Sequence, residues 1–421
     1  MSADTIPPPR ALLCCEAGEG RGHVTTLATV ARALAPHARC QALLARMEHA
    51  DMLAPLCDRV DRGLYLDRLP GLAAPGVLRW SGWLRAHGFG DAETLRSRFD
   101  WCCAALNAIR PALVVGDYAP MMLLAARAMG IPTVATGAAF GLPPAPLPRF
   151  PDLLTPEQAA DHGTHLNPGL EPDEDAMRDT INATLGPIGL KPLTRLPEIY
   201  ACDLSLPRGV PLWDPYAPWR DRPLLLPLDA LPPMAQAPGS GLLVYLPARA
   251  FKDPGLQAAL VRLPCTATVV APSPDMAPIA ALRGHAHLRI VAQPLAPAEV
   301  VARCAAILCA GQAGTLALAA LAGVPVLALP TQHEQLSNAL RAAAGLRGCR
   351  VLPRTRRTPE ALLAALCDLL SDPEPAQAAR SDAQRLRATY AESARDSYSR
   401  LLPPLLRAKP PRPLFPLADA R

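Results

Sequence analysis

A glycine-rich turn near the amino terminus ends in a histidine, which can exchange a proton near neutral pH. The apolar residues 11–15 are typical of a buried strand, and Gly18, Gly20 and Gly22 then precede His23. Glycines permit a tight strand-to-helix turn and let a ligand approach the backbone closely. Their spacing here does not match the G-x-G-x-x-G dinucleotide fingerprint. The turn therefore predicts a site for another ligand, with His23 suited to proton transfer.

A second site is predicted in residues 304–330, which include no charged residue but are interrupted by glycines. About 20 apolar residues can cross a bilayer, but the interruptions leave no unbroken span of that length. The pattern instead predicts a strand over 305–309, a turn over 310–315, a helix over 316–322 and a strand over 324–329. The turn of such a βαβ unit can present N–H groups and a helix N-terminus to an anion.

A polar cluster follows the second of these strands, where open parallel sheets bind their ligands. It contains Glu334 next to Gln335. A carboxylate beside an amide offers acceptors and donors that suit vicinal hydroxyls. An acid-enriched helix N-terminus is the alternative interpretation. Opposite an anion-binding turn, the pair favours a site for a sugar.

These segments resemble the nucleotide-sugar-dependent glycosyltransferases of the GT-B fold, close to the macrolide and plant secondary-metabolite enzymes. In that family a glycine-rich donor motif precedes a glycine-valine-proline strand entry, an acid-glutamine pair and Asn-Ala. At the family's spacing this chain has Ala310-Gly311-Gln312-Ala313-Gly314-Thr315, Gly323-Val324-Pro325, Glu334-Gln335 and Asn338-Ala339. The resemblance implies that the turn at 311–315 binds the donor diphosphate and that Glu334 and Gln335 lie at the donor sugar.

The donor motif also departs from the family pattern. The family's diphosphate-binding histidine is Ala310 here, and the acid that grips the ribose in some members is Leu318. Loss of that acid costs least with a deoxyribose donor such as a dTDP-sugar. Arg249 follows the first strand of the second half and is a candidate diphosphate ligand, because guanidinium donates two parallel hydrogen bonds. A solvated loop arginine is the alternative. Gln293 falls in the loop that packs the nucleotide base in the family.

The resemblance also assigns roles in the amino-terminal half. The family's glycine turn ends in the histidine that removes the acceptor's proton, a position that His23 occupies after Gly20 and Gly22 on the acceptor side. A carboxylate would hold the tautomer of this base, and Asp117 follows the predicted strand 113–115 at the family's place. A turn histidine with its own partners and a cap for a helix over 121–129 are the structural alternatives for His23 and Asp117.

The implied activity is inverting transfer of a hexosyl group from a UDP- or dTDP-sugar to a hydroxyl of a small-molecule or lipid-like acceptor. The resemblance implies no metal and no cofactor beyond the donor. A non-catalytic nucleotide-sugar-binding protein and a sugar-nucleotide epimerase are the alternatives. A net charge of +5 with 4% aromatic residues does not favour nucleic acid as a partner. A lipid acceptor would bring the protein to a membrane surface.

Alternating strand and helix patterns predict an α/β protein with two Rossmann-like, doubly wound domains that face each other across a cleft. We expect an acceptor domain over 1–206, a proline-rich linker over 207–240, a donor domain over 241–400 and a tail over 401–421. The twelve cysteines include no C-x-x-C pair, which favours buried free thiols in a reducing cytoplasm. Residues 1–9 lack the apolar core of a signal peptide.

Overall fold

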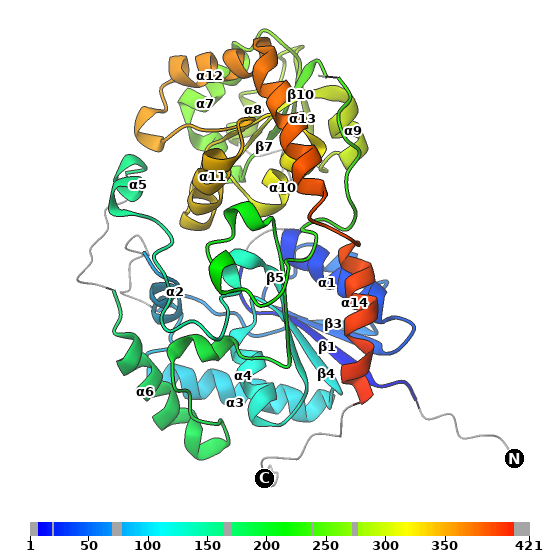
Figure 1. The fold of residues 1–421 in the computed structure, drawn as a ribbon, viewed down its shortest axis with the longest axis vertical. Helices are drawn as coiled ribbons and strands as arrows, with labels where there is room; N and C mark the ends of the chain where they lie inside the picture. The colour runs from blue at the N-terminus through cyan, green and yellow to red at the C-terminus, as the bar shows by residue number, and fades with distance from the viewer. Residues whose placement is uncertain are drawn as a thin grey trace, which may run out of the picture.

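Two parallel sheets, one above the other in Figure 1, form the centres of two domains. The computed structural model describes residues 7–18, 21–69, 78–163, 171–237, 239–271 and 277–407. Within them the first sheet has six strands in the order β3-β2-β1-β4-β5-β6, and the second has six in the order β12-β11-β10-β7-β8-β9. All neighbouring strands are parallel. The predicted α/β fold of two Rossmann-like domains is confirmed.

The strands are short and mostly buried, as is typical of sheets covered on both faces. The first sheet comprises β1 (Arg10–Cys15), β2 (Arg39–Leu44), β3 (Arg59–Arg62), β4 (Leu113–Asp117), β5 (Thr133–Ala138) and β6 (Leu204–Arg208). The second comprises β7 (Gly241–Tyr245), β8 (Ala267–Val270), β9 (Leu288–Val291), β10 (Cys304–Cys309), β11 (Val326–Ala328) and β12 (Cys349–Val351). Each sheet has the doubly wound order, which reverses between β1 and β4 and between β7 and β10. Ligands of open α/β sheets bind at the carboxyl ends of strands beside such a reversal.

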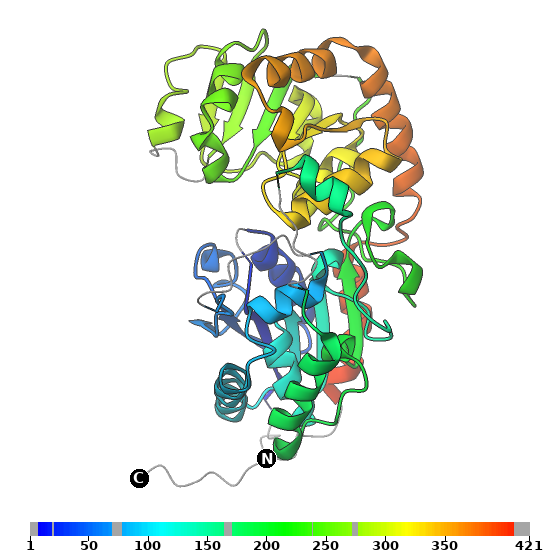
Figure 2. The ribbon, with the colours of Figure 1, turned by 90° about the vertical axis from the view of Figure 1, so that its left-hand side faces the viewer.

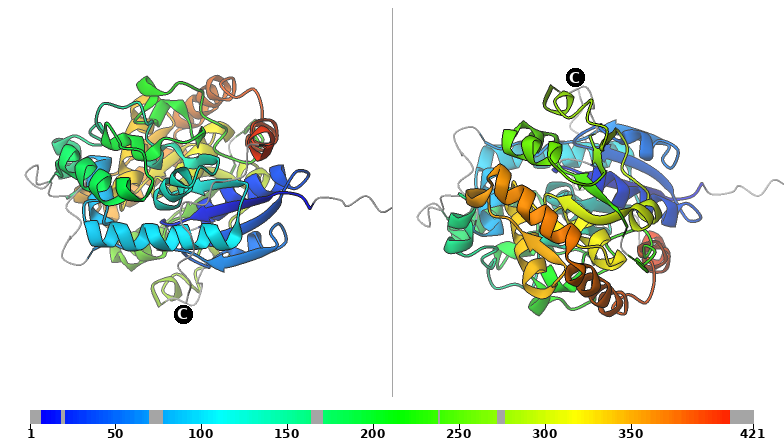
Figure 3. Two further views of the ribbon diagram at one scale, coloured as in Figure 1. Left: turned by 90° about the horizontal axis from the view of Figure 1, so that it is seen from below. Right: turned by 90° about the horizontal axis from the view of Figure 1, so that it is seen from above.

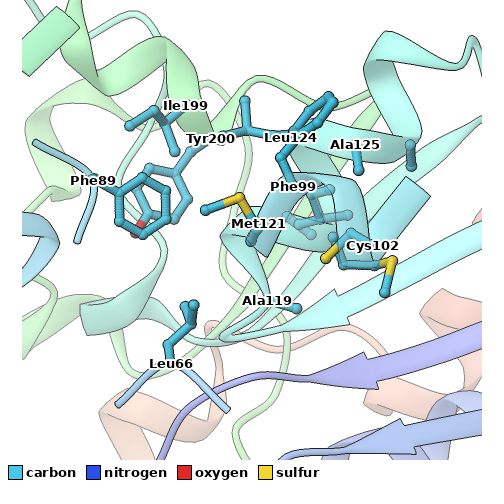
Figure 4. Close-up of a cluster of buried hydrophobic side chains, with 14 of the residues drawn as sticks. Leu66, Phe89, Phe99, Cys102, Ala119, Met121, Leu124, Ala125, Ile199 and Tyr200 are labelled. Atoms are coloured by element: carbon cyan, nitrogen blue, oxygen red, sulfur yellow. The ribbon is translucent and has the colours of Figure 1, made fainter. Parts of the chain in front are cut away.

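Helices cover both faces of the first sheet. Those formed by the amino-terminal half are α1 (Arg21–Leu34), α2 (Trp80–Ala86), α3 (Ala92–Ile109), α4 (Pro120–Ala128), α5 (Pro156–Asp161) and α6 (Glu174–Leu185). On one face α3 and α4 share an apolar core with the η5 turn (Leu196–Tyr200), and Figure 4 shows Phe99 and Cys102 in this cluster with Met121 and Leu124. On the other face α1 packs against α14 (Ala394–Leu401).

The last described part of the chain therefore returns from the second domain to the first. The second domain contains α7 (Pro254–Val261), α8 (Ala277–Ala280), α9 (Pro297–Arg303), α10 (Ala313–Ala322), α11 (His333–Gly345), α12 (Pro359–Ser371) and α13 (Pro373–Arg387). Figure 1 shows α13 beside this domain and α14 beside the other. Residues 388–393 separate α13 from α14 and let the chain cross. Figure 3 shows α3 from below and the helices of the second domain from above.

Two further segments join the domains. In the proline-rich linker Trp213 is buried in the core of the second domain and Tyr216 in that of the first. The segment around α5 extends from the first domain to the second (Figure 2). There Ser337 Oγ donates a hydrogen bond to the Leu153 carbonyl at 3.1 Å, and Thr355 Oγ1 donates to the Asp161 carbonyl at 2.6 Å. The two domains are thus connected by side-chain packing and by hydrogen bonds.

The uncharged stretch 304–330 folds as the predicted strand, helix and strand, namely β10, α10 and β11. The helix starts at Ala313, three residues earlier than expected, because Gln312 already occupies the N-cap position. No helix within the described residues is long and apolar enough to cross a membrane.

Candidate active site

His23 and Asp117 meet at the strand-order reversal of the first sheet. His23 Nδ1 lies 3.0 Å from Asp117 Oδ1, and the exposed fractions of the two side chains are 19% and 1%. His23 lies in the first turn of α1 rather than in the preceding loop, because the helix begins at Arg21. Asp117 ends β4 and does not cap the next helix, whose N-cap is Ala119. The cap alternative for Asp117 is therefore wrong.

Two glycines with left-handed backbone leave room for this pair. Gly18 has φ +99°, and a Cβ there would lie 2.1 Å from His23 Nε2. Gly137 has φ +113°, and a Cβ there would lie 2.2 Å from Asp117 Oδ1. Side chains at either position would collide with the dyad. Among the predicted turn glycines, Gly22 lies in α1 with open space where a Cβ would be, and Gly20 lies outside the described residues.

The buried carboxyl group of Glu16 fixes the turn that carries Asp117. Its two oxygens accept hydrogen bonds from the N–H groups of Met121 at 2.9 Å and Met122 at 2.7 Å, in the first turn of α4. Its own N–H donates to the Tyr118 carbonyl at 3.1 Å. Burial raises the pKa of Glu16 to about 8. We did not predict a role for this residue, although an acid directly after a buried strand was a visible signal.

The electrostatics of His23 suit a proton acceptor. Burial lowers its pKa, but the charge and hydrogen bond of Asp117 outweigh that effect, so the net pKa is raised from its ordinary value. With Nδ1 directed at Asp117, Nε2 remains for a substrate. His23 also lines a cavity of about 300 Å³, whose apolar wall includes Val24 and Leu44 and whose polar residues include Arg46 and Glu48. A small hydroxyl compound in this cavity would lie beside the histidine.

Glu334 of the second domain lies across from this dyad. It is in the first turn of α11 and interacts with the Tyr118 hydroxyl and with the charges of His23 and Asp117. Burial raises the pKa of Glu334, and His23 acts in the opposite direction. The structure thus brings a residue predicted for the donor sugar to the residue predicted as the base.

Aromatic rings surround the dyad on the side of α2. The Tyr118 ring stands edge-on to His23, with ring centroids 4.9 Å apart, and its backbone has φ +52°. A Cβ at Gly141 would lie within 2.3 Å of the Tyr118 ring and hydroxyl. Behind Tyr118, Trp80 and Trp83 are stacked at 4.9 Å. These rings form an apolar boundary beside the histidine.

Gln335 is used within its own domain. It is 4% exposed, and its Oε1 accepts hydrogen bonds from Thr331 N at 3.0 Å and Thr331 Oγ1 at 2.9 Å. Arg249, in the η8 turn (Ala248–Lys252), donates to Thr331 Oγ1 at 3.3 Å. Thr331 therefore links two predicted donor residues at the carboxyl end of the second sheet. Because the Gln335 oxygen is already bonded, a sugar hydroxyl would contact the NH₂ group of this side chain.

The predicted anion turn lies at the reversal of the second sheet. Gly311 has φ +88°, and a Cβ there would lie 2.5 Å from the Gln335 carbonyl. Ala313, Gly314 and Thr315 form the first turn of α10, where the helix dipole is positive. The Thr315 N–H donates to the Gln312 carbonyl at 3.1 Å, so an anion would use the N–H groups that precede it. The Gln312 side chain folds back, so that its Oε1 accepts from Ala310 N at 2.9 Å. The geometry fits an anion.

Gln293, predicted near the nucleotide base, follows β9. Its Oε1 accepts a hydrogen bond at 3.3 Å from Nη1 of Arg21, at the start of α1 in the first domain. The predicted donor residues are therefore grouped along one edge of the second sheet, and the predicted dyad lies along the facing edge of the first. Within the described part of the chain, no group of three His, Cys, Asp or Glu side chains could hold a metal.

Two doubly wound sheets whose reversal points face one another define the GT-B fold. Solved structures of glycosyltransferases share it with this chain. The calicheamicin glycosyltransferase CalG4 has a TM-score of 0.63 at 18% identity, covering 91% of this chain and 95% of its own. The glycotransferase of kitacinnamycin has a TM-score of 0.62 at 17% identity, covering 96% of this chain and 100% of its own. Glycosyltransferase VinC in complex with dTDP has a TM-score of 0.60 at 19% identity, covering 90% of this chain and 96% of its own. No family model and no curated protein matches this chain.

Proposed function

We propose that the protein is an inverting glycosyltransferase that moves a hexosyl group from a UDP- or dTDP-sugar to an acceptor hydroxyl. The observation that carries this proposal is the hydrogen-bonded dyad of His23 and Asp117 facing Glu334 of the other domain. A base in one domain and a hydroxyl-binding carboxylate in the other leave the anomeric carbon between them. The shared fold with glycosyltransferases supports the same assignment.

The reaction follows from these positions. His23 Nε2 takes the proton of the acceptor hydroxyl, and Asp117 stabilises the imidazolium that results. The acceptor oxygen forms a bond to the anomeric carbon while the bond from that carbon to the diphosphate oxygen breaks. The electron pair leaves with the diphosphate, which the first-turn N–H groups and dipole of α10 stabilise. Attack from the face opposite the leaving group inverts the anomeric carbon. We propose that no metal takes part.

The donor pocket favours a nucleotide held by apolar contacts. Leu318 of α10 is partly buried against the same core as Tyr245, Val291 and Leu295. A leucine cannot accept a hydrogen bond from a ribose hydroxyl, so the ribose loses one anchor and a deoxyribose loses none. This supports a dTDP-sugar over a UDP-sugar. VinC, whose fold this chain shares, was solved in complex with dTDP.

The acceptor enters from the first domain. The cavity of about 300 Å³ beside His23 is at the lower end of ligand-site volumes and suits a small molecule or one end of a lipid-like chain. A lipid acceptor would place the reaction at a membrane surface. All twelve cysteines are free thiols, in accord with a reducing cytoplasm.

One observation favours a second function, a non-catalytic nucleotide-sugar-binding protein. The donor turn has Ala310 where a polar contact to the diphosphate is expected, and Gln312 bonds back to the turn itself. In this alternative the donor would bind without reaction. An epimerase is less well supported, because the dyad faces a second substrate's cavity.

Incubation with UDP- and dTDP-hexoses and a panel of hydroxyl acceptors tests the proposal. We expect an inverted glycoside from the wild type, and none from His23→Ala, which should keep its donor affinity. Donor binding without any product from any acceptor would support the non-catalytic alternative. Interconversion of the nucleotide sugar alone would identify an epimerase.

A further inference from the structure

Arg21 is the first residue of α1 and lies two residues before His23. Its guanidinium extends across the domain boundary and donates a hydrogen bond through Nη1 to Gln293 Oε1 at 3.3 Å. The helix that carries the proposed base thus also directs a cation at the second domain. Nothing in the glycine-turn pattern of the sequence predicted this contact.

The loop that Arg21 reaches packs against the same core as α10. Val291 and Leu295 flank Gln293 and pack against the same core as Tyr245 and Leu318. The Tyr245 carbonyl, at the end of β7, accepts a hydrogen bond from Gln312 Nε2 at 3.5 Å. Arg21 also interacts electrostatically with Tyr245 and partly offsets the burial that raises the tyrosine's pKa. Arg21 and Gln312 at the start of α10 thus both lie near Tyr245.

The proposed chemistry needs positive charge at this place. The departing diphosphate gains negative charge, and fixed donors aimed at it lower the barrier. Residues 304–330, which form β10, α10 and β11, contain no charged side chain. In the second domain Arg249 follows β7, in the η8 turn, and donates a hydrogen bond to Thr331. Arg21 is a guanidinium aimed at the same edge from the opposite domain.

We propose that Arg21 is a ligand of the donor diphosphate, supplied across the cleft by the acceptor domain. This inference rests on the proposed function and names the group that compensates for Ala310. In the donor complex the guanidinium exchanges Gln293 Oε1 for diphosphate oxygens, which it can grip with two parallel hydrogen bonds. One turn of α1 then carries both the base that receives the acceptor proton and the positive charge that stabilises the departing diphosphate.

The inference is tested by calorimetry on the full chain. The affinities for dTDP and UDP are measured and compared with those for the corresponding nucleoside monophosphates. Arg21→Ala should weaken diphosphate binding by about tenfold or more, the effect of losing a charge-assisted hydrogen bond. Arg21→Lys should restore part of the loss, because it keeps the charge but not the fork. The matched control is Arg32→Ala, an exposed arginine in the last turn of the same helix, which should bind as the wild type does.

The outcomes separate the two proposals. Equal diphosphate affinity in Arg21→Ala and the wild type, with unchanged melting temperatures, overturns the role of Arg21 alone. An equal loss for the monophosphate and for the diphosphate also overturns it, because the contact would then not be to the diphosphate. Failure of the wild type to bind any of the nucleotides overturns the proposed function and this inference with it.

Discussion

Gly137 provides the space in which the Asp117 carboxylate lies. The two residues come from the neighbouring strands β4 and β5, and a Cβ on Gly137 would lie 2.2 Å from Asp117 Oδ1. Asp117 is thereby packed against backbone on one side and bonded to His23 Nδ1 on the other. Its orientation is fixed before any substrate arrives, as a catalytic acid-base pair requires.

Asp117→Asn should lower kcat by about 10²–10⁴-fold, the usual contribution of a correctly held base. The amide keeps the shape of the side chain but loses the charge that stabilises the imidazolium. Donor affinity should change little, because the donor motif lies in the other domain. Steady-state rates and nucleotide binding measured on the same preparation check this. A variant with wild-type kcat would remove Asp117 from the mechanism.

The rate should rise with pH as His23 loses its proton. The raised pKa of His23 places this rise above the ordinary value of 6.5. Only the neutral imidazole can accept a proton, so kcat/KM should be low at acidic pH and reach a plateau above the His23 pKa. In Asp117→Asn the attraction that raises the pKa is gone, and the remaining activity should rise at lower pH. The opposite displacement would contradict the assigned ion pair.

Gly18→Ala should abolish transfer and leave the donor site intact. Its Cβ would lie 2.1 Å from His23 Nε2, so the imidazole would have to move out of its position. We expect a loss of at least about 10²-fold in kcat. Gly130→Ala is the matched control, because Gly130 also has positive φ but open space around its Cβ position. If both variants lose activity equally, backbone strain and not the collision is responsible.

Glu334→Ala should weaken binding of a sugar nucleotide but not of the bare nucleoside diphosphate. The carboxylate lies opposite His23, where the proposed sugar lies. Loss of a hydrogen bond to a charged group corresponds to about tenfold or more in Kd. Glu360→Ala, with an exposed side chain on α12, is the control. Equal losses for both ligands would place Glu334 away from the sugar.

Glu16 should make the stability of the fold depend on pH. Its folded pKa of about 8 lies above the ordinary value of 4.5, so between these values the folded state holds a proton that the unfolded state releases. The free energy of unfolding should therefore fall as pH rises from about 4.5 to 8. The glutamine of Glu16→Gln cannot ionise. Its NH₂ group would face one of the two backbone N–H donors, those of Met121 and Met122, with no acceptor between them. This variant should be less stable than the wild type at pH 5, with a smaller difference at pH 8.

Thermal unfolding of both proteins across this range measures that difference. A difference between wild type and Glu16→Gln that stays constant with pH would show that Glu16 does not titrate in the folded state.

The strands and the two predicted sites could be found from the sequence because apolar runs and glycines mark them locally. The uncharged stretch gave the correct order of β10, α10 and β11. The start of the helix predicted over 316–322 was placed too late: α10 begins at Ala313, because its first turn contains glycine. A weak helix former at an N-terminus looks like a loop when only its local preference is considered.

Local sequence patterns could not predict the contacts between distant segments. Gly137 has no special neighbours in the sequence, and its role appears only where β5 lies beside β4. Glu16 looked like one more polar residue of the turn, yet it accepts hydrogen bonds from Met121 and Met122, more than a hundred positions away. The hydrogen bond from Arg21 to Gln293 joins residues that are 272 positions apart in the sequence. Local propensity and periodicity contain no information on these pairs.

The return of α14 to the first domain has a consequence for engineering. The helix buries Tyr398 beside α1, and the Tyr398 hydroxyl lies 2.6 Å from Thr136 Oγ1 in β5. The last described α-helix to be synthesised thus completes the domain synthesised first. A chimaera that replaces everything after the linker would also replace the support behind the helix of His23. Exchange of donor domains between related chains should therefore use two junctions, one in the linker and one between α13 and α14.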